Sequence, residues 1–268
     1  MIVFPNCKIN LGLNVVAKRS DGFHDLETVF YPLPLHDVLE IVPAQNGTNS
    51  FQSTGLAIPG DPEDNICLKA VKLLNKDYQV PAVNIHLHKV IPMGAGLGGG
   101  SSDGTSSLKL LNEMFSLGLD QERLQDYARQ LGSDCAFFVV NRPVFGYGKG
   151  DRFLPLALDL SRFKIVLAIP PYHINTARAY EVIKPAVPAK SARTITEMAV
   201  EEWRNFFVND FETSVFAKYP EIAEIKKRLY GLGAAYASMT GSGSAVYGLF
   251  RNEPPIKDAF PGCAVYVL

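Results

Sequence analysis

The sequence predicts an α+β protein built from two lobes. Strand patterns fill most of the first forty residues, a strand, a glycine-rich loop and a helix follow one another over residues 83–115, and an apolar strand pattern restarts near residue 160. The 268 residues are 47% hydrophobic, which is enough apolar material for one large core or two small ones. We place the lobe boundary at residue 158, with an N-terminal lobe 1–158 and a C-terminal lobe 159–268.

The N-terminal lobe begins with strands. The runs KINLGLNVV, LETVFYPL and DVLEIVPA are β-rich, and Asp21-Gly22 after the first run is a turn signal because glycine tolerates positive φ. We expect a short strand bounded by loops within residues 45–60 and a helix over Asn65–Asn75. Val83–His88 alternates strictly between apolar and polar residues, which is typical of a half-buried strand.

Helices and further strands complete the two lobes. Leu108, Leu111 and Phe115 recur at helical spacing, so a helix is expected to begin near Asp103. Gly132 would end the next helix as the first residue beyond it. The other predicted elements are helices at 121–130, 196–207 and 222–229, strands at 136–140, 144–148, 163–170, 235–239, 245–250 and 263–268, and a loop at 185–195.

The charge balance argues against a nucleic-acid or membrane partner. With 26 basic and 27 acidic residues the net charge is −1, whereas nucleic-acid binding usually requires a basic stripe. No apolar run reaches the roughly 18 residues of a membrane span, and the first residues lack the basic-then-apolar pattern of a signal peptide. We therefore expect a cytoplasmic protein, either a monomer or a weak homodimer.

Neither the cysteines nor the histidines predict a metal site or a disulfide. The cysteines lie far apart without a C-x-x-C pair, which is typical of reduced thiols. His86 and His88 share one strand face, but no third ligand is near, so a solvated face is favoured over zinc. The cysteines are Cys7, Cys67, Cys135 and Cys263.

A glycine-rich stretch predicts an anion-binding loop. Five of the seven residues 94–100 are glycine, and Ser-Ser-Asp and a helix follow. Glycines let backbone N–H groups approach an anion, and a helix N-terminus adds its positive dipole end. Glycines can also serve a tight turn alone, but a turn needs only one or two. Phosphate is the anion that best matches several converging N–H groups.

Two common nucleotide motifs fit this stretch poorly. The P-loop requires a lysine directly after the glycines, and none is present. The dinucleotide fingerprint matches as Gly94-x-Gly96-x-x-Gly99, with Glu113 downstream. However, the preceding strand alternates instead of being continuously apolar, and Glu113 falls inside the following helix and not at the end of a second strand.

A third motif fits throughout. The pattern P-x-G-x-G-L-G-x-S-S resembles the phosphate loop of the GHMP kinases, with one extra glycine before the serines. The resemblance implies ATP as the phosphoryl donor, with Mg²⁺ on its phosphates. The loop residues that it assigns to ATP are Pro92, Met93, Gly94, Ala95, Gly96, Leu97, Gly98, Gly99, Gly100, Ser101 and Ser102.

Other segments narrow the resemblance within the family. The runs CKINL, DGFH, LGSDCAFF and TGSG resemble the members that phosphorylate the 2-hydroxyl of a cytidine-diphosphate-linked methylerythritol in the non-mevalonate route to isoprenoids. The resemblance implies a two-lobed GHMP kinase fold, with a ribosomal-S5-like N-terminal lobe and a ferredoxin-like C-terminal lobe. The chain departs from the usual pattern at Cys7, Phe23 and Cys135-Ala136, and Phe23 lacks the hydroxyl of the usual tyrosine.

The resemblance also assigns the reacting groups. Asp134 matches the catalytic aspartate and Lys8 the catalytic lysine of the family, although by pattern alone they would be a helix cap and a solvated strand-edge residue. Asn65 falls where the family contacts the nucleotide. The hydroxyls of Ser101 and Ser102 are the expected contacts to Mg²⁺.

The acceptor contacts follow in the same way. Phe23 and Tyr180 are the expected stacking rings for cytosine, and His24 is the expected hydrogen-bonding partner of the base edge, although each could be an ordinary aromatic residue. Asn10 is a candidate contact to the polyol or diphosphate. A second glycine-rich loop, with Thr240, Gly241 and Ser242, is expected to close over the acceptor and the phosphates.

Three alternatives remain. The acceptor could be that of a homoserine- or mevalonate-type kinase, although Lys8, Asn10 and the segment Asp21–His24 argue against this. The chain could be a non-catalytic nucleotide-binding protein on the same fold, although Lys8, Asp134 and the loop are intact. An RNA-binding module is suggested only by the ribosomal relative of the fold, and the charge balance argues against it.

Overall fold

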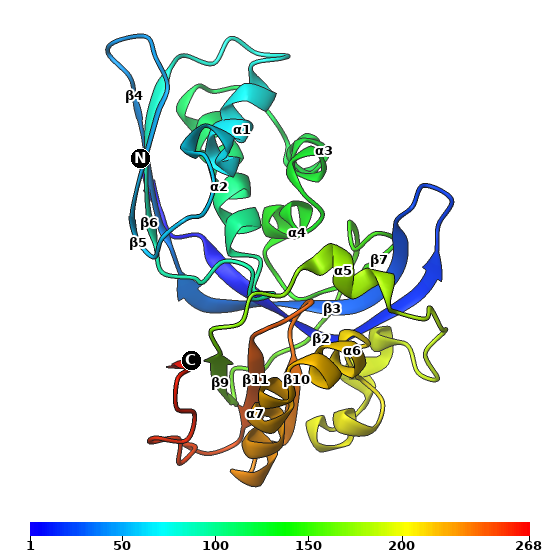
Figure 1. The fold of residues 1–268 in the computed structure, drawn as a ribbon. Helices are drawn as coiled ribbons and strands as arrows, with labels where there is room; N and C mark the ends of the chain where they lie inside the picture. Colours follow the sequence, from blue (N-terminus) through cyan, green and yellow to red (C-terminus); the bar gives the residue numbers. More distant parts are fainter. The chain divides into compact units, whose positions relative to one another are not determined.

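The computed structural model describes residues 1–268 as two compact units that alternate along the chain (Figure 1). The predicted α+β class is confirmed. The predicted boundary at residue 158 stays a prediction, because the units are defined by packing and each contains several segments. The first unit comprises 1–8, 32–93 and 98–142, and the second comprises 9–31, 94–97 and 143–268.

The first unit contains a four-stranded sheet in the order β1-β4-β6-β5. The β1-β4 and β4-β6 pairs are antiparallel, whereas β5 runs parallel to β6. The alternation seen in the sequence of β6 is real: Val83, Ile85 and Leu87 are buried. The strands are β1 (Ile2–Val3), β4 (Val38–Pro43), β5 (Ser50–Gly55) and β6 (Val83–Lys89).

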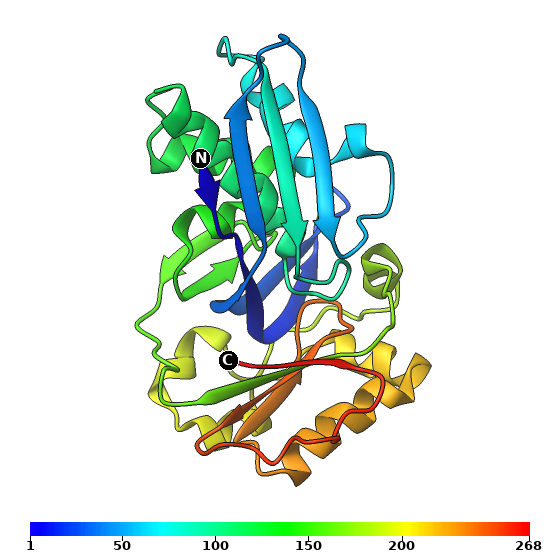
Figure 2. The same ribbon diagram turned by 90° about the vertical axis from the view of Figure 1, so that its left-hand side faces the viewer.

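Helices cover one face of this sheet. Figures 1 and 2 place α1 and α2 together on the same side of it, and α2 packs against α1, α3 and α4. Asn65 begins α1, because its Oδ1 accepts a hydrogen bond from the Cys67 N–H at 2.9 Å. The segments are η1 (Pro62–Asp64), α1 (Ile66–Leu74), α2 (Gly99–Met114), α3 (Gln121–Leu131) and α4 (Cys135–Val140).

A buried charge cluster fixes the start of α2 to the sheet. The Lys89 ammonium contacts Asp37 and lies 2.8 Å from Asp103 Oδ2, and all three side chains are at most 2% exposed. Asp37 Oδ1 also accepts the N–H groups of Val90 and Ile91 at 2.6 and 2.8 Å. Burial raises the pKa of Asp103 to about 7, against the opposing effect of the Lys89 charge. The ammonium at the end of β6 thus compensates two carboxyl groups, one from Asp37 directly before β4 and one from Asp103 in α2.

The second unit contains two further sheets. One has the order β2-β3-β7-β8, and its strands β2 and β3 each continue into the first unit. The other has the order β10-β11-β9-β12 and is antiparallel throughout. The strands are β2 (Asn6–Lys18), β3 (His24–His36), β7 (Val144–Tyr147), β8 (Arg152–Pro155), β9 (Lys164–Ile169), β10 (Tyr236–Met239), β11 (Val246–Phe250) and β12 (Ala264–Val267).

The second sheet of this unit carries the unit's apolar core. Helix α7 packs on β10 and β11, and Ile222 and Leu229 bury their side chains among residues of β9 and β11 (Figure 1). Such burial stabilises each side chain by roughly 1.5–3 kcal/mol. The helical segments are α5 (Thr176–Glu181), η2 (Ala192–Glu197), η3 (Val200–Asn205), α6 (Phe211–Lys218) and α7 (Pro220–Gly231).

Several predicted elements need correction. The strand expected at 136–140 is helix α4, because a short apolar run has no period that separates a helix from a strand. Helix α2 begins at Gly99, four residues before Asp103, since glycines and serines hide a helix start. The helix expected at 196–207 is two 3₁₀ segments, and α5 and α6 were not predicted. Gly132 ends α3 in an extended conformation (φ 175°) as its cap residue.

Other expectations concern cysteines and membrane spans. All four cysteines are free thiols, and only Cys263 is partly exposed. No helix in the structure has the length and apolarity that crossing a bilayer requires.

The charge cluster gives a stability prediction. Replacing Lys89 by Met leaves the buried Asp37 and Asp103 without their counter-ion, so we expect the free energy of unfolding to fall by about 3–5 kcal/mol. Urea denaturation measures this. Lys72→Met is the control, because Lys72 pairs with Glu63 on the surface and its loss should cost about 1 kcal/mol or less. Equal losses of unfolding free energy in the two variants would contradict the role of Lys89 as the counter-ion of the buried carboxylates.

Candidate active site

An ion pair between Lys8 and Asp134 is the first feature of the site. The Lys8 Nζ lies 3.2 Å from Asp134 Oδ2, with the lysine side chain 3% exposed and the aspartate side chain 31% exposed. Asp134 occupies the N-cap position of α4, but its side chain makes no capping hydrogen bond. Asp134 is therefore not the helix cap that the sequence pattern alone suggested. Its carboxylate faces Lys8 and solvent. Lys8 is buried and not a solvated edge residue.

The first unit's part of the glycine-rich loop lies against this pair. Gly98 has φ +70° and precedes α2, whose first turn has no side-chain cap. A Cβ on Gly98 would lie 3.1 Å from Lys8 Cε and from the Phe138 ring. Glycine therefore lets the backbone approach the lysine. The uncapped N–H groups of α2 and its dipole favour an anion here.

The two serines and Asn65 occupy different environments. Ser102 is 2% exposed, and its N–H donates to Gly98 O at 2.9 Å. Ser101 is half-buried beside Cys135, where burial raises the pKa of the thiol to about 11 and the Ser101 hydrogen bond opposes the rise. Asn65 uses its Oδ1 to cap α1, so a nucleotide contact from its amide stays a prediction.

The second unit holds residues 94–97 against the second glycine-rich loop. Thr240 Oγ1 lies 3.2 Å from Gly96 O, and the Ala245 N–H donates to Ala95 O at 3.1 Å. A Cβ on Gly96 would lie 2.1 Å from Thr240 O, so only glycine permits this approach. Residues 94–97 and 240–245 are thus side by side, although they lie about 145 positions apart in the sequence. The prediction that the second glycine-rich loop acts together with the first requires such an arrangement.

Asn10 braces the second loop. Its backbone N–H donates to Thr240 Oγ1 at 3.1 Å, and its Oδ1 accepts the Gly241 N–H at 3.1 Å. Its Nδ2 donates to Thr28 Oγ1 at 3.1 Å. Both ends of the amide therefore bind protein groups, which makes Asn10 a structural support of the loop; the predicted contact to the acceptor stays a prediction. Ser242 Oγ lies 2.8 Å from Thr176 Oγ1 at the start of α5.

The structure brings together two of the three side chains that are predicted to bind the cytosine. The rings of His24 and Tyr180 stack with centroids 5.1 Å apart and an interplanar angle of 16°, and Tyr180 also meets Phe211 edge-on at 4.8 Å. Phe23 is 57% exposed and instead lies under Lys149, whose Nζ is 4.8 Å from the ring centroid. No sequence signal distinguished Lys149 from other surface lysines.

Arg19 fixes the turn that carries Phe23 and His24. Its guanidinium lies 3.1 Å from Asp21 Oδ2 and 2.8 Å from Asp25 Oδ1. The hydrogen bond from Arg19 holds the pKa of Asp21 below its usual value. The carboxylate also accepts the Phe23 N–H at 3.1 Å. The predicted Asp-Gly turn is therefore present and has an additional charged clamp.

Comparisons with known proteins define the class. The chain matches the family models "GHMP kinases N terminal domain" over residues 65–142 and "GHMP kinases C terminal" over residues 183–261. The solved mevalonate kinase of Methanococcus jannaschii has a TM-score of 0.73 at 14% identity, covering 100% of this chain and 97% of that one, which shows a common fold. The molecule thus has the two-lobed GHMP kinase fold that the sequence predicted.

Closer relatives narrow this class. The 4-diphosphocytidyl-2-C-methyl-D-erythritol kinase of Bacteroides fragilis is 52% identical over 96% of this chain and 94% of its own. That of Cytophaga hutchinsonii is 48% identical over 95% and 94%. A crystal structure of 4-(cytidine 5'-diphospho)-2C-methyl-D-erythritol kinase has a TM-score of 0.80 at 30% identity, covering 100% and 98%. The chain belongs to the 4-diphosphocytidyl-2-C-methyl-D-erythritol kinase family.

The contrast between Gly96 and Gly100 gives a second prediction. Gly96→Ala should lower the free energy of unfolding by about 1–3 kcal/mol, because it combines a positive φ of +80° with a backbone clash. Gly100→Ala, in helix α2 with open space around it, should leave stability unchanged or raise it by up to about 1 kcal/mol. Thermal and urea denaturation measure both. A Gly96→Ala protein as stable as Gly100→Ala would refute the close approach to Thr240.

Proposed function

We propose that the protein transfers the γ-phosphoryl group of ATP to the 2-hydroxyl of 4-diphosphocytidyl-2-C-methyl-D-erythritol, a step of the non-mevalonate route to isoprenoid precursors. The family membership supports the kinase activity and the acceptor. The single structural observation that carries the chemistry is the Lys8–Asp134 pair. It is a partly exposed carboxylate beside a buried ammonium, next to a glycine-rich helix N-terminus.

Asp134 acts as the base for the acceptor hydroxyl. An alcohol is a weak nucleophile, and a positioned carboxylate can take its proton as the bond to phosphorus forms. The carboxylate is accessible to a ligand because its side chain is 31% exposed and does not cap α4. Lys8 keeps Asp134 oriented and adds a positive charge where negative charge develops in the transition state.

The phosphates of ATP bind at the glycine-rich loop. The uncapped N–H groups at the start of α2 supply hydrogen-bond donors, and the helix dipole adds to their attraction. Magnesium is expected on the phosphates, where it neutralises charge during transfer. Its usual ligands are oxygens, and the chain offers the hydroxyls of Ser101 and Ser102 but no group of three acidic or imidazole side chains. Because the protein would supply only these two hydroxyls, they fit a magnesium ion that is held mainly by the phosphates of ATP.

The cytosine of the acceptor binds at Phe23, His24 and Tyr180. A base exposes two π faces, and stacking on an aromatic ring contributes about 1–3 kcal/mol. The exposed ring of Phe23 and the stacked pair His24–Tyr180 offer such faces. The imidazole of His24 can in addition hydrogen-bond the base edge. Thr240, Gly241 and Ser242 then contact the acceptor or the phosphates.

Turnover with a panel of acceptors tests this function. We expect ADP release from ATP and magnesium with the cytidine-diphosphate-linked methylerythritol, and none above background with mevalonate or homoserine. Turnover with one of the latter two would keep the kinase class and overturn the acceptor. Tight ATP binding without turnover on any acceptor would favour the non-catalytic alternative.

Replacing Asp134 by Asn tests the base. The amide keeps the size of the side chain but cannot take a proton, so we expect kcat to fall by about 10²–10⁴-fold while the Kd for ATP stays within about two-fold. Asp126→Asn is the matched control, because Asp126 lies on the surface of α3. Initial rates and calorimetric ATP titration measure the two quantities. Unchanged kcat in Asp134→Asn would exclude this residue as the base.

A further inference from the structure

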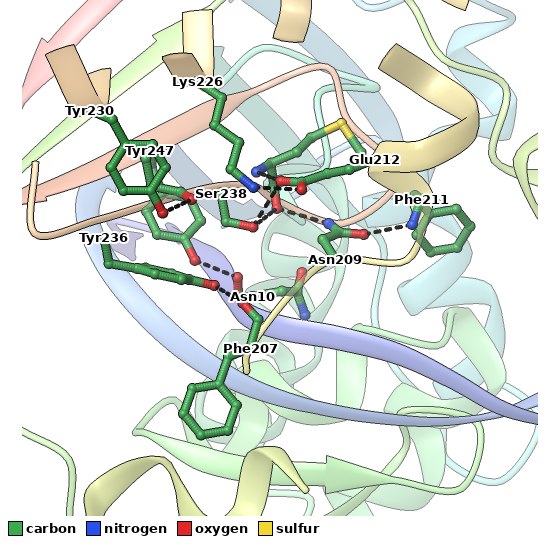
Figure 3. A network of polar contacts seen from close by, with 12 residues as sticks. Asn10, Phe207, Asn209, Phe211, Glu212, Lys226, Tyr230, Tyr236, Ser238 and Tyr247 are labelled. Carbon is green, nitrogen blue, oxygen red and sulfur yellow. Dashed lines mark hydrogen bonds and ion pairs between the residues drawn. The ribbon is translucent and has the colours of Figure 1, made fainter. Parts of the chain in front are cut away.

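A buried polar network joins the start of α6 to the second glycine-rich loop (Figure 3). Asn209 lies at its centre and is 2% exposed. Its Nδ2 donates to Met239 O and to Gly241 O, each at 2.8 Å. These carbonyls flank Thr240, so one side-chain amide holds the backbone on both sides of the loop's first residue.

Asn209 is itself held firmly. Its Oδ1 accepts the Phe211 N–H at 3.0 Å in the first turn of α6. The next residue, Asp210, fastens this turn to β2, since its carboxylate accepts the Val15 N–H at 2.7 Å and the Asn14 amide at 3.0 Å. The donor that reaches the loop therefore has little freedom to move.

Glu212 fixes the strand that leads into the loop. Its Oε1 accepts the Met239 N–H at 2.9 Å and lies 3.1 Å from Ser238 Oγ, while its Oε2 pairs with Lys226 at 2.6 Å (Figure 3). Met239 thus donates its N–H to Glu212 and its carbonyl accepts from Asn209. Two side chains therefore fix the end of β10: Asn209, which lies just before α6, and Glu212, which lies in its first turn.

Gly241 is likewise fixed by two side-chain hydrogen bonds, one to its N–H group and one to its carbonyl. Its N–H donates to Asn10 Oδ1 at 3.1 Å, and its carbonyl accepts from Asn209 at 2.8 Å. Gly241 has φ +55°, and a Cβ there would lie 3.0 Å from Gly96. Asn10 and Asn209, from distant parts of the sequence, thus fix the peptide groups on both sides of Gly241. This residue lies against Gly96 of the first glycine-rich loop.

We propose that Asn209 is a positioning residue of the 240–244 loop: it holds the backbone at Met239 and Gly241 so that the loop keeps the conformation in which it meets Gly96. Only a side chain with two N–H donors can satisfy both carbonyls at this distance from the backbone. Aspartate has the same shape but no donor when ionised, and serine has one. The effect expected on catalysis rests on the function proposed above, whereas the effect on loop conformation does not.

Hydrogen–deuterium exchange on the full-length protein measures the loop conformation directly. In Asn209→Asp we expect the amides of residues 240–246 to exchange about 10- to 100-fold faster, because two buried carbonyls lose their donor. Asn209→Ser, which retains one donor, should give a smaller acceleration. Amides of β9 should be unaffected in both. Asn252→Asp is the matched control, because Asn252 is exposed and the chemical change is the same.

Kinetics on the same variants complete the test. We expect kcat with ATP and the cytidine acceptor to fall about 10-fold or more in Asn209→Asp, to fall less in Asn209→Ser, and to be unchanged in Asn252→Asp. Unchanged loop exchange in Asn209→Asp would overturn the positioning role, and so would acceleration spread evenly into β9. If the wild-type protein phosphorylates none of the acceptors, the proposed function fails, and the exchange data still decide whether Asn209 positions the loop.

Discussion

The buried ammonium of Lys8 is the constraint on which the arrangement of the proposed site in the first unit depends. Removing a charge from water is costly, and an ammonium that is 3% exposed requires an anion beside it to compensate that cost. Asp134 supplies that anion, which explains why it occupies a helix start without capping it. The pairing leaves the carboxylate oriented by the protein and still in contact with solvent, which is the condition that a base requires.

Packing alone requires several glycines of the loop, in addition to the phosphate binding proposed above. Gly98 has no side chain because Lys8 and Phe138 occupy that space, and Gly96 has none because the Thr240 carbonyl does. Gly99 faces Ile91 and Lys89 in the same way. The chain passes from one unit to the other at either end of residues 94–97. Within each unit the glycines allow a close approach of the backbone, to Lys8 in the first unit and to the 240–244 loop in the second. A tight turn alone would not require this distribution.

Local patterns predicted the parts of the fold that have a clear period or turn. The alternation in β6, the Asp-Gly turn after β2 and the apolar face of α1 are each visible in a few consecutive residues. Helix α4 was predicted as a strand because its six residues are too few to show a helical period. Helix α6 was not predicted because polar residues at its start face inward: Asn209, just before the helix, and Glu212, in its first turn, are buried and bind backbone groups at the end of β10.

Some residues of the candidate site could likewise be predicted from the sequence, and others could not. The glycine-rich loop, Lys8 and Asp134 were predicted because they lie in motifs that resemble a known family, and the structure brings the lysine and aspartate within 3.2 Å. Asn209, Arg19 and Lys149 lie outside any such motif, and their contacts depend on residues far away in the sequence or on the detailed shape of a turn. Such contacts can be found only once the chain is folded.

The most direct measurement is ³¹P NMR of a single reaction mixture containing the protein, ATP, magnesium and 4-diphosphocytidyl-2-C-methyl-D-erythritol. The account predicts that the β- and γ-phosphate signals of ATP are replaced by those of ADP, together with one new phosphomonoester signal that coupling assigns to the oxygen on carbon 2 of the erythritol. ADP with inorganic phosphate alone, or a phosphomonoester on another hydroxyl, would contradict it.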